Sequence, residues 1–134
     1  MSRLIVIAVL PALLTPAPAA AAATFFQSPS QNIGCVIERS SGVRCDIRQR
    51  SWRPPPRPDS CPVDWASGVT VGRSGRAMFT CAGDTVLGMG SALAYGRSIT
   101  RGRFRCTSRR TGMRCRNQRS GHGFRLSRAR ARRY

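Results

Sequence analysis

Two short phrases repeat one pattern, SGVRC at residues 41–45 and TGMRC at residues 111–115. Each phrase follows an earlier cysteine, Cys35 or Cys106, with nine and eight residues between the two cysteines. In each phrase a Gly supplies a turn, and an apolar residue two positions before the Cys points to the same face of a strand as the Cys does. Two strands joined by such a turn place their cysteines opposite each other, within disulfide reach. The repeat therefore predicts two β-hairpins, each closed by its own disulfide.

The cysteine count agrees with a disulfide framework, because a short chain with an even number of cysteines is typical of one. Fifteen pairings are possible by counting alone. The repeat favours Cys35–Cys45 and Cys106–Cys115, which leaves Cys61–Cys81, although the two hairpins could instead exchange cysteines. Zinc is the rival interpretation, but the chain has no Cys-x-x-Cys pair and a single His. No metal or other cofactor is therefore expected.

The rest of the chain also favours strands over helices. Short β-type runs, punctuated by Gly, Ser, Asn and Asp, occur at residues 33–37, 43–47, 69–71, 77–81, 85–89, 103–106 and 112–116. The predicted fold is all-β: a small disulfide-stabilised barrel or sandwich of about six to eight strands, built from hairpins. Residues 53–58 (RPPPRP) are expected to form an extended polyproline connector. Residues 128–134 (RARARRY) fit either an edge strand or a frayed tail.

The N-terminus has the pattern of an export signal. Arg3 gives a short positive region, residues 4–14 are apolar, and residues 15–23 (TPAPAAAAA) are small and helix-breaking. We expect residues 1–23 to be a Sec-type signal peptide and residues 24–134 to be a single domain with an Arg-rich C-terminal third. The alternative is an uncleaved anchor, which the prolines in this segment disfavour. The expected location is secreted or associated with the cell envelope.

Charge is the strongest compositional feature. The chain has 23 basic residues, all Arg, against five acidic ones, for a formal net charge of +18. Residues 97–134 contain 14 Arg and no Asp or Glu, whereas residues 24–96 contain eight Arg and all five acids. A field of this size attracts polyanions, so an anionic cell-envelope polymer or an acidic protein is the expected partner. The alternative is a solubilising charge without a partner.

Eleven arginines of the C-terminal third are candidates for contact with a polyanion, and affinity is expected to reside in residues 97–134. They are Arg101, Arg103, Arg105, Arg109, Arg110, Arg114, Arg116, Arg128, Arg130, Arg132 and Arg133.

Catalytic candidates are sparse. His122 stands between two glycines, and a triad can be written only by joining it to Ser120 or Ser127 and to Asp84. There is no Gly-x-Ser-x-Gly elbow and no phosphate-binding glycine loop, and bridged cysteines leave no thiolate nucleophile. A non-catalytic protein is therefore expected, and no catalytic residue is assigned.

Several phrases, taken in order, resemble a family of small exported bacterial proteins, mostly actinobacterial, of unknown function. They are FQSPS at 26–30, GVRCDI at 42–47, CPVDW at 61–65, CAGDTVL at 81–87, Tyr95-Gly96, and SGHGF at 120–124 followed by residues 126–128 (LSR). The resemblance implies a secreted, disulfide-bonded domain and no particular activity. The high Arg content near the C-terminus departs from that family.

The expected function is an exported, non-catalytic binding domain that contacts anionic envelope polymers. Two alternatives are an inhibitor of a secreted hydrolase and a small hydrolase that uses His122 with Asp84 or Asp64.

Overall fold

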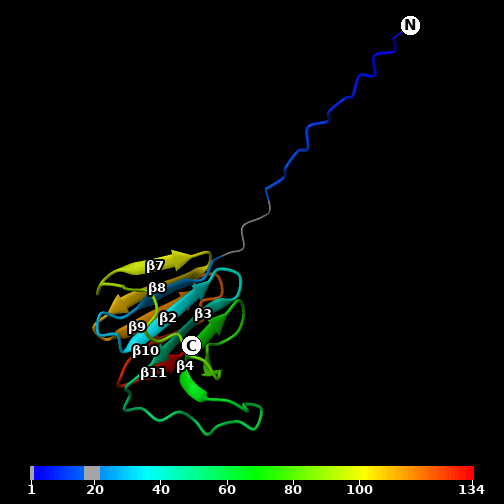
Figure 1. Ribbon diagram of the computed structural model, residues 1–134. Helices are drawn as coiled ribbons and strands as arrows, with labels where there is room; N and C mark the ends of the chain where they lie inside the picture. The colour runs from blue at the N-terminus through cyan, green and yellow to red at the C-terminus, as the bar shows by residue number, and fades with distance from the viewer. Residues whose placement is uncertain (1, 17–21) are drawn as a thin grey trace.

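The computed structural model describes residues 2–16 and 22–134 (Figure 1). Residues 2–16 are exposed and form no helix or strand, and they lead away from the folded domain. Most of the expected cleavage region, residues 17–21, lies outside the described residues. The signal peptide and its boundary at residue 23 stay predictions.

The described residues contain eleven strands and no helix. The strands are β1 (Thr24–Gln27), β2 (Ile33–Glu38), β3 (Gly42–Ile47), β4 (Trp65–Gly72), β5 (Met78–Cys81), β6 (Ser91–Ala92), β7 (Ser98–Arg101), β8 (Phe104–Arg109), β9 (Gly112–Asn117), β10 (Gly123–Leu126) and β11 (Ala131–Arg133). They form a first sheet in the order β5-β4-β3-β2-β1-β6 and a second sheet in the order β11-β10-β9-β8-β7. The all-β prediction is confirmed, and of its two forms the sandwich is correct.

The two predicted hairpins lie one in each sheet. Cys35 pairs with Cys45 across β2 and β3, and Cys106 pairs with Cys115 across β8 and β9. Both pairs are disulfides with Cα atoms 4.1 Å apart, and Cys61 is joined to Cys81. The structure therefore has the local pairing that the repeat favoured.

The core lies between the sheets and includes both hairpin disulfides. Alternate residues of β8 and β9 are buried, as expected for strands with one buried face, whereas β2 and the end of β3 are buried on both faces. The largest buried side chains are Phe104 and Phe124 of the second sheet and Ile37 of the first. Residues of both sheets belong to one apolar cluster, so the sandwich has a single core.

The predicted strand at 85–89 is wrong. This segment crosses the outer face of the first sheet, where Gly34, Asp46 and Gly68 form one row across β2, β3 and β4. A Cβ atom on Gly34 would lie 2.6 Å from the carbonyl oxygen of Val86. The row of small residues lets the segment lie against the sheet, so Val86 is buried without joining a strand ladder.

The structure also places residues 128–134, whose form the sequence left open, and the expected connector at residues 53–58. Residues 128–134 include the edge strand β11, which pairs with β10. Residues 53–58 form neither helix nor strand and connect β3 to β4, and the Pro55 carbonyl accepts a hydrogen bond from the Trp65 indole at 3.0 Å.

Candidate functional site

The outer surface of the second sheet carries two rows of arginines. Arg105 of β8 lies directly opposite Arg116 of β9. In the next row, Arg114 of β9 lies opposite Arg125 of β10, which in turn lies opposite Arg132 of β11. All five side chains are exposed. We call these five residues the arginine face.

Strand geometry explains why these arginines share one surface. Arg105 must point outward because it lies between the buried Phe104 and Cys106. Arg114 and Arg116 must do the same because they flank the buried Cys115. The same alternation turns Arg125 outward between Phe124 and Leu126. The disulfide that fixes the β8–β9 register therefore also fixes which arginines face each other.

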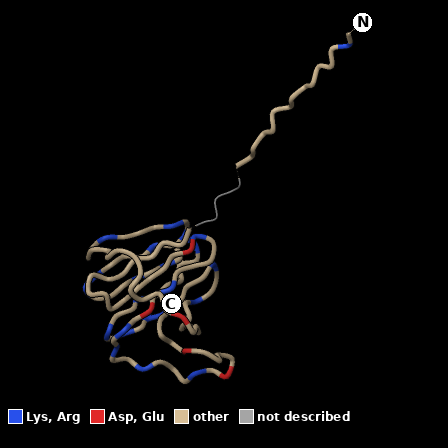
Figure 2. The backbone as a smooth tube through the Cα atoms, in the orientation of Figure 1, with Lys and Arg blue, Asp and Glu red and all other residues tan. Residues whose placement is uncertain are grey.

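Like charges directly opposite each other in a sheet are destabilising. Neighbouring strands lie about 4.8 Å apart, so a row of three arginines spans about 10 Å, comparable with the Debye length at 0.1 M salt. No Asp or Glu occurs between residues 97 and 134 to offset them (Figure 2). The arginine face therefore concentrates positive charge, which attracts anions.

Polar and aromatic groups accompany the arginine face. Arg114 Nε donates a hydrogen bond to the Tyr134 hydroxyl at 3.1 Å, and its guanidinium lies 6.0 Å from the Tyr134 ring centre. A hollow of about 240 Å³ is bordered by three arginines of the face together with Thr107 and Gln118. These groups can donate to the oxygen atoms of an anionic group.

The structure brings together only four of the eleven predicted contact residues on this face: Arg105, Arg114, Arg116 and Arg132. Arg125 belongs to it but was missed, although its alternation with Phe124 and Leu126 could have revealed it. Arg133 turns inward, over the Phe79 ring at 4.4 Å, and burial and then the charge of Arg76 lower its pKa.

The other predicted arginines lie around the edges of the domain. Arg109, Arg110 and Arg128 border a cleft at one end of the sandwich together with Arg48.

Arg103 lies beside Arg39, Arg73 and Arg119. The pKa of Arg103 is lowered by desolvation and then by the charges of Arg73 and Arg119. Arg101 donates to the Thr24 hydroxyl at 3.2 Å, and Arg130 lies in the turn before β11. Arginines from before residue 97 thus share these surfaces, so the positive surface is not confined to residues 97–134.

The carboxylates proposed to act with His122 lie on the first sheet, whereas His122 lies on the second. His122 occupies the turn between β9 and β10, where its backbone carbonyl accepts from Asn117 N–H at 2.8 Å and its N–H donates to Ser120 Oγ at 3.2 Å. Asp84 lies against the outer face of the first sheet, and Ser127 Oγ is bonded within its own turn to Arg130. Asp64 directly precedes β4 of the first sheet.

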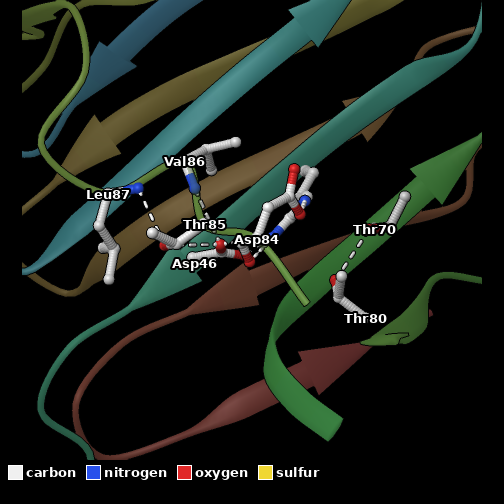
Figure 3. Close-up of polar contacts among 8 residues, drawn as sticks. Asp46, Thr70, Thr80, Asp84, Thr85, Val86 and Leu87 are labelled. Atoms are coloured by element: carbon white, nitrogen blue, oxygen red, sulfur yellow. Dashed lines mark hydrogen bonds and ion pairs between the residues drawn. The ribbon is translucent and has the colours of Figure 1, made fainter. Parts of the chain in front are cut away.

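Asp84 instead belongs to an ion-pair network on the first sheet (Figure 3). Arg44 donates to both oxygens of the fully buried Asp46, at 3.0 and 2.8 Å, and to Asp84 Oδ1 at 2.9 Å. Asp46 Oδ2 also accepts from the Thr85 hydroxyl and from Val86 N–H, both at 3.1 Å. This network fastens residues 84–86 onto the sheet, which is a structural role.

The ion pairs shift the pKa values of their members. Burial opposes the charge of Arg44, but the hydrogen bonds to Asp46 and Asp84 outweigh it and raise the pKa of Arg44 above its ordinary value. The hydrogen bond from Arg44, and then its positive charge, hold the pKa of Asp84 below its usual range.

The sulfur atoms of Cys35, Cys45 and Cys115 lie within 4.8 Å of one another, as metal ligands would. All three belong to disulfides, and the described chain has no free cysteine, so these sulfurs offer no thiolate to a metal. Among residues 2–16 and 22–134, no helix is long and apolar enough to cross a membrane.

These features define a small, disulfide-bonded β-sandwich whose second sheet has a cationic outer face. Three disulfides in a domain of this size are typical of extracellular proteins. The chain belongs to a family of unknown function, DUF6636, which it matches over residues 5–134. No match was found among curated proteins or among solved structures.

Proposed function

We propose that the protein is an exported, non-catalytic binding domain that holds anionic polymers of the cell envelope on its arginine face. The observation that carries this proposal is the register of the second sheet, which sets Arg105 against Arg116, and Arg114 against Arg125 and Arg132. Without a ligand this juxtaposition costs stability, and a polyanion would convert the repulsion into attraction.

Several features support an extended ligand over a compact one. The face is an exposed sheet surface that follows strands β8 to β11, and its arginines repeat from strand to strand. A chain of regularly spaced negative groups can contact several guanidiniums at once, and each guanidinium can form two parallel hydrogen bonds with an oxyanion. Such binding depends on charge spacing more than on the identity of the monomer.

Export supports the choice of an envelope polymer as the anion. The disulfides require an oxidising compartment, and the N-terminal 23 residues have the pattern of a Sec-type signal. In that compartment the abundant polyanions are envelope polymers, and cytoplasmic nucleic acid is out of reach.

A charge-matched pair of triple variants tests the proposal. R114Q/R125Q/R132Q removes three charges from the face, while R39Q/R53Q/R97Q removes three exposed charges elsewhere. With the oxidised protein and isolated anionic wall polymer, sedimentation should show the first variant losing at least tenfold in affinity and the second less than threefold. Equal losses in the two variants would mean that net charge, and not the arginine face, determines binding.

A further inference from the structure

A second positive feature lies at one end of the sandwich, away from the arginine face. There the turn of the β8–β9 hairpin meets the open end of the β2–β3 hairpin and borders a cleft of about 480 Å³. Small-molecule sites commonly have volumes of about 300–1,000 Å³. The cleft shares no residue with the arginine face, and we call it the end cleft. Its lining includes Arg48, Tyr95, Ser108, Arg109, Arg110 and Arg128.

The charge of this cleft has one sign. It has four arginines and no Asp or Glu among its lining residues. Within the described part of the chain, the guanidiniums of Arg109, Arg110 and Arg128 form no hydrogen bond or ion pair, and that of Arg110 stacks over the Tyr95 ring at 4.8 Å. Three guanidiniums therefore keep their donors free beside one cleft.

Ser108 supplies the independent observation. Its side chain lies on the inward face of β8, borders the end cleft and is 1% exposed, and its hydroxyl has no hydrogen-bond partner among the described residues. The backbone of Ser108 is fully bonded to the turn at residues 96–97. The hydroxyl is therefore the part of Ser108 that lacks a hydrogen-bond partner. The other buried side-chain atom without a partner among the described residues, Gln27 Oε1, does not border this cleft.

The repeat between the hairpins shows that this hydroxyl is unusual. Ser108 stands two residues after Cys106, where the first hairpin has the buried Ile37 two residues after Cys35. Its cross-strand partner is Met113, where the first hairpin pairs Ile37 with the smaller Val43. The large Met113 explains a small residue at 108, but Ala would serve that purpose without burying a polar group.

The second polar replacement in the same hairpin is fully accounted for. Asn117 occupies the position that corresponds to Ile47. Its amide group donates to the carbonyls of Gly72 and Arg73 and accepts from the N–H groups of Arg119 and Ser120, at 3.0 to 3.2 Å. Ser108 is thus the replacement in the repeat that no contact within the fold explains, and buried polar groups of this kind need an explanation.

We propose that the end cleft binds the phosphate group of a small phosphate ester. The guanidiniums of Arg109, Arg110 and Arg128 hold the phosphate oxygens, and the Ser108 hydroxyl donates to one of them. Because this hydroxyl is covered in the free protein, binding requires a rearrangement of the lining that uncovers it. A phosphate ester matches this site better than a carboxylate because it carries more oxygen acceptors and up to two charges.

Isothermal titration of the oxidised protein with glycerol phosphate at about 150 mM salt tests this proposal. We expect saturable one-to-one binding, no comparable binding of acetate, and about tenfold weaker binding in S108A, the effect of one hydrogen bond to a charged group. R110Q should weaken binding to a similar extent. R125Q removes the same charge from the arginine face and should leave binding unchanged.

Unfolding measurements exclude a merely structural effect. S108A should unfold at the same or a higher urea concentration than the wild type, because it removes an unpaired buried hydroxyl. Wild-type affinity in S108A, equal losses in R110Q and R125Q, or equal binding of acetate would each overturn the proposal. Polymer binding by the arginine face can survive all of these results, so a failure of the end cleft is distinguishable from a failure of the proposed function.

Discussion

The sulfur atoms of Cys45 and Cys115 lie 3.6 Å apart, although they belong to different disulfides in different sheets. Each sulfur comes from the central part of its hairpin, and both cysteines are fully buried. The two hairpins therefore meet through their cross-links at the centre of the core. The disulfides act as packing elements between the sheets as well as covalent ties within each sheet.

This contact predicts an unusual order of disulfide contributions. Loop entropy alone gives about 2.7 kcal/mol for a ten-residue loop and about 3.3 kcal/mol for a twenty-residue loop. The double variant C35A/C45A should nevertheless lose more stability than C61A/C81A, because it also leaves a cavity in the core, worth about a further 1–2 kcal/mol. Cys81 is exposed, and the buried Cys61 lies outside the core cluster, so loss of this bridge leaves no cavity at the centre of the core. Urea unfolding of both variants measures the order, and a larger loss in C61A/C81A would contradict the packing role.

Asp46 should be the acidic residue on which stability depends most. D46N removes the charge that partners Arg44 in a buried site and should cost about 3 kcal/mol. E38Q is the matched control, because Glu38 is exposed and its carboxylate accepts a hydrogen bond from the Ser41 hydroxyl at the surface, and it should cost less than about 0.5 kcal/mol. Chemical denaturation gives both values. Equal, small effects would show that Asp46 does not fasten the 84–86 segment.

Gly34 should be intolerant of even one methyl group. A Cβ there would lie 2.6 Å from the Val86 carbonyl oxygen and 2.9 Å from the Leu87 Cα, so backbone must move. G34A should cost about 1–3 kcal/mol and expose residues 84–87 to amide hydrogen exchange. Gly72 is the control, because its added Cβ would meet only the Ser41 oxygen at 3.7 Å. Similar exchange patterns in G34A and G72A would refute the close approach of the segment to the sheet.

The Arg44–Asp84 ion pair should make stability depend on pH in the acid range. The pKa of Asp84 is lower in the folded state than in the unfolded chain, so its contribution is present above the unfolded pKa of about 3.9 and is lost as pH falls through the folded value. The stability difference between wild type and D84N should therefore be present at pH 6 and shrink as the pH falls below about 3.9. A difference that is constant from pH 6 to pH 2 would mean that the carboxylate's charge plays no part.

The hairpins could be predicted from the sequence because their signal is local. The turn glycine, the alternation around each cysteine and the short spacing all fall within residues 33–47 or 104–117. The prediction of a strand at residues 85–89 was wrong because Val86 is buried by a long-range contact with Gly34 and Asp46. Local alternation of apolar and polar residues cannot reveal such a contact. Strand β7 has mostly polar residues and owes its place to pairing with β8.

The arginine face was predictable in composition but not in arrangement. The excess of Arg after residue 97 is plain in the sequence, but only the strand register separates outward Arg132 from inward Arg133. Likewise, Arg48 at the open end of the first hairpin and Arg110 in the turn of the second border one cleft, although they are far apart in the chain. Sequence counting therefore overestimated how many of these arginines share a single surface.

The salt dependence of polymer binding tests the central claim most directly. With duplex DNA as a probe polymer, contacts from the five arginines of the face should give a slope of log affinity against log salt near −4.5, about −0.9 for each contact. In R114Q/R125Q/R132Q the slope should fall to about −2, while R39Q/R53Q/R97Q should keep the wild-type slope. A slope that is unchanged in the face variant, or that falls equally in both variants, would contradict the assignment of polyanion binding to the arginine face.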